Sequence, residues 1–542
     1  MKTNSKKWFI VTLIVALLLT APLWLLVSFV FEPTNDNWTH IANTLLPEYI
    51  ENSLILMLGV SIGTLLFGVS SAWIISQYHF FGKKILHWAL LLPLAMPAYI
   101  IAYTYTGLLG FEGPVQSYLL TFVDIRTLLE WFPEVRSLGG AILMFSLVLY
   151  PYVYLLARAS FAAKNQAIID ASKTLGASPL RRFFNIALPM ARPAIIAGLT
   201  LALMETLADF GTVQYFGIPT FTTGIYRTWT GFGDTSTAAQ LSLLLLAFVT
   251  LLMLVEFWSR RQAKYFSQSQ TSKQSNIQIL TGTKSFWAFI ICFLPILLGF
   301  IVPAIQLLAW SISTAETNFN LEFLKLMWNS FYLAFLTASS AVIIALLLAY
   351  SKRIQGNRFI RTMVKITTLG YAIPGTIIAI AVIIMFSSID NAFDAWMIKN
   401  FDISTGLLLS GTLFILVFAY TFRFLSVSLQ TIDSGLSKIK DSMDEAALTL
   451  GANRWDVLFK IHLPLLKTSL LTAFILVFVE VLKELPTTLI LRPFNFNTLS
   501  VKAYEMAADE RLADAGLPAL LIVLTGIIPV IILSKIIGKQ HG

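Results

Sequence analysis

The sequence predicts an all-α polytopic membrane protein with about twelve transmembrane helices, arranged as two parallel repeats of six. Three observations support this fold class. The 542 residues are 57% hydrophobic and only 12% charged, and a mean hydropathy of +0.76 excludes a soluble globular protein of this length. Apolar runs long enough to cross a bilayer recur along the whole chain. Two polar segments of similar sequence, residues 170–189 and 445–464, occupy equivalent places in this pattern.

The predicted spans are apolar runs taken in chain order. The first half contains six of them, at residues 8–31, 53–76, 86–109, 139–160, 193–209 and 240–258. The second half contains six more, at residues 286–311, 329–351, 362–386, 405–428, 468–485 and 515–536. The first run follows Lys2, Lys6 and Lys7 as a signal peptide would. We expect a retained helix, because the run exceeds the usual apolar region of ~7–15 residues and has no clean cleavage site.

The distribution of Lys and Arg determines the predicted orientation. With both termini in the cytoplasm, the inside segments hold 29 of the 38 Lys and Arg residues, and the outside loops hold the other 9. This topology accounts for the net charge of +9, so we expect membrane lipid and no nucleic acid as a partner. The single cysteine, Cys292, rules out an intrachain disulfide.

A duplication relates the two halves. A Ser/Gln-rich linker at residues 260–285 separates a first repeat, residues 1–259, from a second repeat, residues 286–542. Equivalent positions lie 275 residues apart, as in Gly176 and Gly451, Pro189 and Pro464, Glu205 and Glu480, Asp209 and Glu484, Phe221 and Phe496, Thr223 and Thr498, and Arg227 and Lys502. Further upstream the separation is 277, as in Asn52 and Asn329, and Pro97 and Pro374. An even number of spans per repeat inserts both copies the same way up.

Each repeat carries one polar segment in a predicted cytoplasmic loop, at residues 161–190 and 436–465. Apolar residues of the second loop recur at the spacing of an amphipathic helix, namely Leu436, Ile439, Met443, Ala446, Ala447 and Leu450. Gly451 follows where a helix end favours positive φ, and a second short helix is expected to stop before Pro464. An interfacial helix that only packs beneath the bundle would show a similar pattern. Two such loops in register favour a shared function.

The residues of these loops resemble the EAA loop in the permeases of binding-protein-dependent ABC importers. The second loop matches that pattern at Glu445, Ala446, Ala447, Gly451, Ile461, Leu463 and Pro464. The first loop keeps Ala171, Gly176, Ile186, Leu188 and Pro189, but has Asp170 in place of the Glu and Ser172 in place of the second Ala. Residues 203–229 and 480–523 are more narrowly similar to fused, double-length permeases for ferric iron, and permeases for thiamine look alike.

This resemblance implies a type I ABC importer permease in the bacterial cytoplasmic (inner) membrane. In that family the loop is a coupling helix seated on a cytoplasmic ATPase. Two loops therefore imply two copies of the ATPase, and a periplasmic or lipid-anchored binding protein delivers the substrate. The implied substrate is ferric iron, with thiamine or another small solute as the alternative.

The chain itself has no sequence signature of an ATPase or a metalloenzyme. It has no G-x-x-x-x-G-K-[ST] motif, and its Gly-Lys pairs, Gly82-Lys83 and Gly538-Lys539, are not followed by Ser or Thr. Its five histidines are scattered. We therefore expect a translocation subunit that binds no cofactor, with ATP used by a partner subunit. The alternative is an ion-coupled secondary transporter with parallel repeats.

Two pairs of acidic residues lie toward the outer end of the span after each loop, namely Glu205 with Asp209 and Glu480 with Glu484. The i,i+4 spacing predicts that each pair shares one helix face. We expect the four to line the mouth of the substrate pathway, since hard oxygen ligands suit a ferric ion. The other interpretation is a structural ion-pair network with Lys483, Arg227 or Arg492. The aromatic loop at residues 213–232 is either a gate, a docking surface for a binding protein, or an interfacial belt.

Overall fold

The computed structural model describes residues 2–163, 172, 176–262 and 278–539, and most of them are helical. Within these residues the only strands are β1 (Tyr78–His79) and β2 (Gln278–Ile279), which pair in parallel over two residues. The predicted all-α fold class is confirmed. The chain divides into two compact units, one built around residues 319–502 and the other around residues 40–224.

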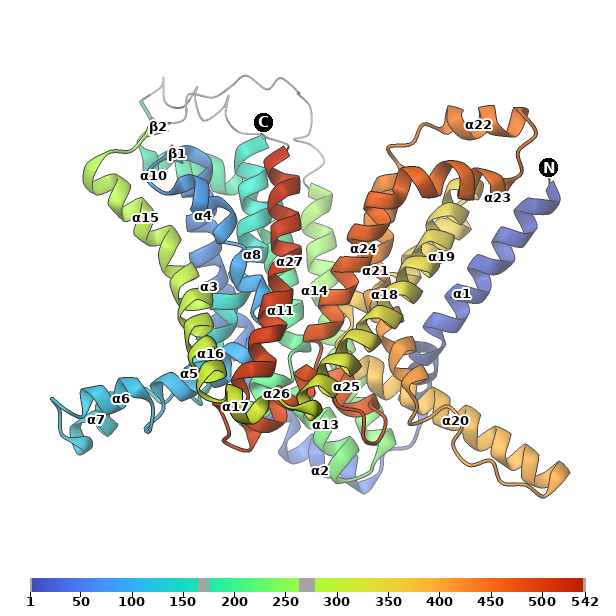
Figure 1. Cartoon of the computed structure of the whole chain (residues 1–542), viewed down its shortest axis with the longest axis horizontal. Helices are drawn as coiled ribbons and strands as arrows, with labels where there is room; N and C mark the ends of the chain where they lie inside the picture. The colour runs from blue at the N-terminus through green and yellow to red at the C-terminus, as the bar shows by residue number, and fades with distance from the viewer. Residues whose placement is uncertain (1, 164–171, 173–175, 263–277, 540–542) are drawn as a thin grey trace. The chain divides into compact units, whose positions relative to one another are not determined.

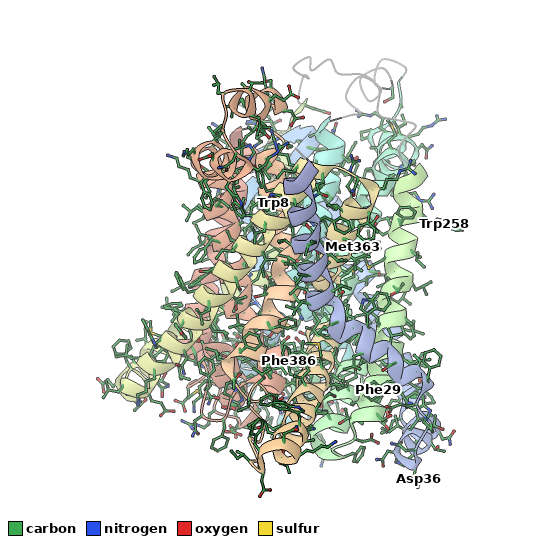
Figure 2. The ribbon with its side chains drawn as sticks, turned by 90° about the vertical axis from the view of Figure 1, so that its right-hand side faces the viewer. Trp8, Phe29, Asp36, Trp258, Met363 and Phe386 are labelled. Carbon is green, nitrogen blue, oxygen red and sulfur yellow. The ribbon has the colours of Figure 1, made fainter. Side chains whose placement is uncertain are left out.

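Unit 1 comprises residues 1–39, 225–244 and 319–502. Its elements are α1 (Lys2–Ser28), η1 (Phe29–Phe31), α18 (Leu321–Gln355), α19 (Arg358–Thr367), η6 (Leu369–Ala372), α20 (Gly375–Phe401), α21 (Leu413–Leu436), α22 (Asp441–Thr449), α23 (Arg454–Asp456), η7 (Val457–His462), α24 (Leu463–Lys483) and α25 (Pro486–Leu491). α18, α21 and α24 pack together as its core, and α1 packs along α18, α19 and α20 (Figure 2).

Unit 2 comprises residues 40–224, 245–318 and 503–542. Its elements are α3 (Leu46–Gln77), α4 (Lys83–Ala89), η2 (Leu92–Ala95), α5 (Ala98–Leu109), α6 (Pro114–Leu119), α7 (Ile125–Trp131), α8 (Leu138–Ala163), α10 (Pro179–Arg182), η3 (Phe183–Ala187), α11 (Leu188–Ala208), α12 (Gly211–Tyr215), α15 (Gly282–Ile296), η5 (Leu297–Ile301), α16 (Val302–Ser313), α17 (Ala315–Asn318) and α27 (Gly516–Lys539). α3, α8 and α11 form its core, α15 packs on α3, and α27 packs on α16 and η2 (Figure 1). Four helices cross the unit boundaries, namely α2 (Asp36–Thr44), α13 (Phe221–Gly231), α14 (Thr235–Gln262) and α26 (Leu499–Ala508).

Each unit contains helices from both predicted repeats. In unit 1, α1 of the first repeat joins the core of the second repeat, and the hydroxyls of Thr12 and Ser351 lie 2.6 Å apart between α1 and α18. In unit 2, α15, α16 and α27 of the second repeat join the core of the first, where the Tyr105 hydroxyl donates to the carbonyl of Leu298 at 2.8 Å. The compact units therefore do not coincide with the repeats. The repeat boundaries stay a prediction about the sequence.

Ten described helices are long and apolar enough to cross a membrane, or up to eleven if one bent pair counts as a single span. α27 adds a shorter apolar helix over residues 516–532. Two of the predicted spans are not the single straight helices that the sequence had predicted. The run predicted at 86–109 bends by 92° between η2 and α5, and the run predicted at 362–386 is interrupted before α20.

Proline explains both interruptions, and it lies at equivalent positions of the two repeats. Proline disfavours a helical conformation of the residue before it. Accordingly Met96, before Pro97, has ψ 110°, and Ile373, before Pro374, has ψ 129°. Pro97 and Pro374 then precede the first residues of α5 and α20. Each repeat thus gains a non-helical corner inside its helix bundle, and the corner at Gly375 borders one of the acidic sites described below.

Candidate functional site

The two EAA segments, residues 161–190 and 436–465, share one backbone construction from the glycine turn onward, within the part that the structure describes. Gly176 has φ +76° and Gly451 has φ +90°, so the predicted glycine turns are confirmed. An added Cβ at either glycine would meet no atom within 4 Å. The requirement for glycine is therefore conformational and not steric, because residues with a side chain rarely adopt positive φ.

The helix expected to run from Leu436 to Leu450 is broken. Leu436 ends α21, Lys440 is extended with ψ 139°, and α22 begins at Asp441. The guanidinium of Arg353 occupies the break, since it donates to the carbonyls of Leu436 and Ile439 at 2.7 and 3.0 Å. Periodicity alone could not reveal this interruption, because Arg353 comes from α18.

The second short helix does not stop before Pro464, as was expected, but continues into α24. A π-helical turn, η7, joins α23 to α24, and the equivalent turn η3 joins α10 to α11 ahead of Pro189. Proline has no N–H and its ring clashes with the carbonyl four residues earlier. The wider π turn accommodates the ring within a continuous helix, and π turns occur often at functional sites.

The apolar side of α22 faces outward. Leu450 is 89% exposed and Met443 is 43% exposed, and Glu445 and Ala446 of the motif are exposed beside them. The remaining motif residues are placed as follows: Ala447, Ile186 and Ile461 are half-buried, Pro189 and Pro464 are exposed, and Asp170 and Ala171 lie outside the described residues. An exposed apolar face on a short helix suits a docking surface.

A cluster of charged and aromatic side chains lies beneath α22, and we call Trp8, Tyr350, Arg353, Asp444 and His462 the anchor cluster. The Asp444 carboxylate accepts from Arg353 Nε at 2.8 Å, and its other oxygen lies 2.7 Å from His462 Nε2. The Tyr350 ring packs edge-on against His462 at 5.3 Å between ring centroids, and Trp8 packs edge-on against Tyr350 at 5.1 Å.

Sequence reasoning missed this cluster. His462 was interpreted as one of several scattered histidines, although it lies 18 residues after Asp444 within the same segment. The sequence did show a histidine and an aspartate on either side of the glycine turn. It did not show that they form a cluster, because this cluster also needs Arg353, which lies 91 residues before Asp444 and which no local pattern connects to the EAA segment.

The first pair of acids lies at the junction of α11 and α12. α11 ends at Ala208, and Asp209 is extended with ψ 137°. Its carboxylate accepts from the backbone N–H of Thr212 at 2.9 Å and from that of Val213 at 3.3 Å, so it caps the start of α12. Glu205 is half-buried on the last turns of α11.

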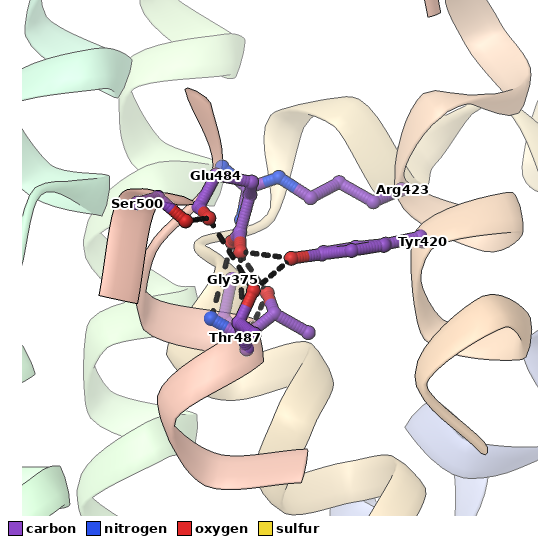
Figure 3. Close-up of polar contacts among 7 residues, drawn as sticks. Gly375, Tyr420, Arg423, Glu484, Thr487 and Ser500 are labelled. Atoms are coloured by element: carbon purple, nitrogen blue, oxygen red, sulfur yellow. Dashed lines mark hydrogen bonds and ion pairs between the residues drawn. The ribbon is translucent and has the colours of Figure 1, made fainter. Parts of the chain in front are cut away.

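The second pair lies at the junction of α24 and α25, where Glu484 is 6% exposed. Figure 3 shows the Glu484 carboxylate surrounded by donors. It accepts from the Tyr420 hydroxyl at 2.8 Å, and from the Thr487 hydroxyl and N–H at 2.6 and 3.1 Å. Arg423 supplies the counter-charge at 3.5 Å. At Gly375 an added Cβ would lie 2.6 Å from the carboxylate and still closer to the Arg423 guanidinium, so a larger residue would displace the groups of this ion pair.

Two expectations about the acids need correction. Each pair was expected to share one helix face, but the helix ends one residue before the second acid, whose carboxylate turns to cap the next helix. Lys483 does form an ion pair, at 3.6 Å, with Glu480. Glu484 forms its ion pair with Arg423, whereas the sequence predicted Lys483, Arg227 or Arg492 as the partner. The pathway role of the four acids stays a prediction.

The equivalence of the repeats changes after the acids. The Thr222 hydroxyl donates to the carbonyl of Asp209 at 2.7 Å, and the Ser500 hydroxyl donates to that of Glu484 at 2.8 Å. These two hydroxyls lie 278 residues apart, as do the starts of α13 and α26. The pairs Phe221 with Phe496, Thr223 with Thr498, and Arg227 with Lys502 are therefore wrong, because the segment between Glu484 and α26, residues 485–498, is three residues longer than the segment between Asp209 and α13, residues 210–220.

Among the described residues, no group of three or more His, Cys, Asp or Glu side chains is arranged to hold a metal ion. Asp209, Glu480 and Glu484 are each engaged with backbone or side-chain donors of their own unit.

Comparison with known proteins finds one family twice in this chain. The model of the binding-protein-dependent transport system inner membrane component matches residues 64–268 and 341–540. The Fe(3+)-transport system permease protein FbpB 2 of Haemophilus influenzae is 28% identical over 492 residues, 90% of this chain and 90% of that protein. The ferric transport system permease protein FbpB of Actinobacillus pleuropneumoniae is 26% identical over 86% of this chain and 66% of that protein. The molybdenum transport system permease protein ModB of Escherichia coli is 29% identical over 36% of this chain and 85% of that protein.

Proposed function

The chain belongs to the family of binding-protein-dependent transport system inner membrane components, and we propose that it is the translocation subunit of an ATP-driven importer of ferric iron. It is a multi-pass protein of the inner membrane. The relatives that match most of the chain are named for ferric iron, whereas those named for molybdenum or sulfate match 30–38% of it. This coverage favours ferric iron over thiamine or another small solute, which remains the alternative.

The observation that carries the proposal is the repeated construction of the EAA segments. Both have a glycine at positive φ, a π turn and a membrane-length helix that begins with Leu-Pro. On the second, the exposed apolar side of α22 suits a groove on a partner protein. We assign this partner as a cytoplasmic ATPase, with one copy on each segment.

The proposed division of labour follows from the missing nucleotide motif. With no Gly-rich phosphate loop in the sequence, ATP would be hydrolysed on the separate ATPase chains. Closure of the ATPases would move each EAA segment as a rigid body, together with the continuous helix that follows it. A periplasmic or lipid-anchored binding protein would deliver the substrate at the opposite end of the permease.

The arrangement within each unit supports the orientation with both termini in the cytoplasm. In unit 1, Trp8 lies near the start of α1 and packs against Trp455 of the second EAA segment at 4.8 Å between rings (Figure 2). In unit 2, the C-terminal end of α27 and α10 of the first EAA segment lie at one end of the bundle (Figure 1). If the EAA segments meet a cytoplasmic ATPase, both termini lie on the same side.

We propose different roles for the members of each acidic pair. Glu205 and Glu480 would contact the cation, because both are partly exposed on the last turns of α11 and α24. Asp209 and Glu484 would hold the non-helical corner in place, because both cap the following short helix. At the pathway mouth, two of the acids would thus contact the cation, and the other two would hold the backbone around them.

Transport of radiolabelled ferric iron and of labelled thiamine in a strain lacking this gene tests the proposal. Ferric uptake should return only when the chain, its ATPase and its binding protein are all expressed. Restored thiamine uptake without ferric uptake would show that thiamine, and not ferric iron, is the substrate. Uptake driven by a proton gradient in vesicles that contain the purified chain alone would overturn the ATP-driven class in favour of a secondary transporter.

A further inference from the structure

The anchor cluster joins four elements of unit 1 at one point. Asp444 comes from α22, His462 from the π turn η7, Arg353 and Tyr350 from the end of α18, and Trp8 from α1. The Tyr350 hydroxyl also donates to the carbonyl of Arg454 at 2.6 Å, which ties α18 to α23. Movement of α22 would therefore displace three membrane helices directly, namely α1, α18 and α24.

We infer that the anchor cluster is the rigid joint through which the second EAA segment moves α18, α24 and α1, and that Asp444 and His462 are its positioning residues. This inference rests on the proposed function, since it assumes that a partner pulls on α22. It adds which contacts carry the movement and which helices receive it.

The Asp444 carboxylate is the centre of the joint. Each of its oxygens is engaged, one by Arg353 and the other by His462, and the side chain is buried. Asp441 meets the same guanidinium at 3.1 Å, but its side chain is 88% exposed. Removing one partner of a buried ion pair leaves an uncompensated charge, whereas an exposed pair contributes little. The two carboxylates therefore make a matched comparison on one helix.

His462 contributes a single polar contact to the joint. Its side chain is fully buried, Nε2 faces Asp444, and Nδ1 has no hydrogen-bond partner among the described residues. A glutamine at this position can place a donor nitrogen near the same point, whereas a leucine cannot. If the joint depends on that donor, glutamine should preserve it.

The first EAA segment lacks these residues. At the corresponding positions the sequence has Ser76 for Arg353, Ile169 for Asp444 and Ala187 for His462. Trp73, the counterpart of Tyr350, instead packs against Phe161 and Phe183 at 5.4 and 5.2 Å between ring centroids. The sequence therefore has no charged residue at the positions that correspond to Arg353, Asp444 and His462.

The test compares four variants of the full chain, co-expressed with its ATPase and binding protein: Asp444→Asn, Asp441→Asn, His462→Leu and His462→Gln. The first readout is substrate imported per ATP hydrolysed, measured beside the amount of ATPase that co-purifies. We expect Asp444→Asn and His462→Leu to lower this ratio about tenfold while the ATPase stays bound. Asp441→Asn and His462→Gln should stay within about twofold of the unmodified chain.

The second readout needs no partner protein. Cys292 is the sole cysteine and is buried, so spin labels can be attached at Thr449→Cys on α22 and Arg358→Cys on α19, both exposed positions. The distance distribution should be narrow for the unmodified chain and His462→Gln, and broad for Asp444→Asn and His462→Leu.

If the ATPase fails to bind the unmodified chain, the proposed function fails while this measurement still tests the joint. The inference is overturned if His462→Gln behaves like His462→Leu, or Asp444→Asn like Asp441→Asn, in the spin-label distances.

Discussion

The two EAA segments share a glycine turn and a π turn, and they differ in the residues around these turns. Both turn at a glycine and pass through a π turn into a long helix. In the second, Asp444 and His462 lie in a buried ion-pair cluster, where the sequence of the first has Ile169 and Ala187. Both copies thus keep the glycine turn and the π turn, while the charged residues of the anchor cluster have no charged counterpart in the sequence of the first copy.

The helix junctions that carry the second acid of each pair also differ, and again the second repeat has more charged and polar residues. Asp209 caps α12, whereas Glu484 caps α25 and also meets Tyr420 and Arg423. The positions 275 residues before Tyr420 and Arg423 hold Phe145 and Val148. The sequence of the first repeat therefore has apolar residues where the second places the phenol and the guanidinium that meet its acid. The second repeat should be more sensitive to loss of charge at both ends of its membrane helices.

The largest effect is expected for Glu484→Gln. Loss of the carboxylate charge leaves Arg423 buried without its counter-charge, which should lower stability by about 3–5 kcal/mol. Asp209→Asn should cost about 1 kcal/mol or less, because asparagine caps a helix about as well as aspartate does. Thermal unfolding in detergent measures both. Arg423→Gln combined with Glu484→Gln should recover part of the loss, and equal stability of the two single variants would remove the contrast between the repeats.

The second largest effect is expected for Gly451→Val. Valine is strained at φ +90°, at a cost of about 1–3 kcal/mol, and the distorted turn should weaken ATPase docking. Asparagine, which tolerates positive φ better, is the matched control. The same change at Gly176 should matter less, because that copy departs from the motif. Co-purification of the ATPase at its normal level with both glycines replaced by valine would refute a role for the turns in docking.

Neutralising one acid of each pair tests the pathway mouth. Glu205→Gln with Glu480→Gln keeps side-chain size, so the complex should assemble while uptake falls about tenfold through lost attraction for the cation. The measurement is initial uptake rate, normalised to assembled complex. Poor assembly would support the structural interpretation of these acids, and normal assembly with normal uptake would exclude both roles.

The smallest effect is expected at the exposed face of α22. Leu450→Ser removes apolar surface that contacts solvent in this chain, so thermal stability should not change. Docking of the ATPase should weaken by about 1 kcal/mol or less, within about fivefold in affinity. Leu175 precedes Gly176 in the first segment, and Leu175→Ser provides the matched variant. An unchanged affinity for both would place the docking surface elsewhere.

Features with a local cause were predictable from the sequence. The apolar runs located most membrane helices because span length follows from bilayer thickness. Gly176 and Gly451 were recognised because a helix end favours glycine at positive φ. The prolines at 97 and 374 were visible, but the predicted spans ran across the breaks because a hydropathy pattern does not register a change of direction.

Features that depend on distant segments were not predictable. Arg353 interrupts the helix expected from Leu436 to Leu450, and Arg423 pairs with Glu484 from another helix. Neither arginine is close in sequence to its partner, and one sequence alone does not show pairing across such a separation. The three-residue shift before α26 was missed for a related reason, because coincidental matches at a separation of 275 concealed the insertion.

The place of α1 in unit 1 has a consequence for biosynthesis. α1 ends at Ser28, and the helix on which it packs, α18, begins only at Leu321. At about 5–20 residues per second, the ribosome needs roughly 15–60 s to make the intervening chain. During that interval α18, α19 and α20, on which α1 packs, have not been made, so α1 must be stable in lipid without them. Its strongly apolar sequence from Trp8 to Phe31, which contains no charged residue, meets this requirement, and a charge introduced there should harm insertion before it harms the folded protein.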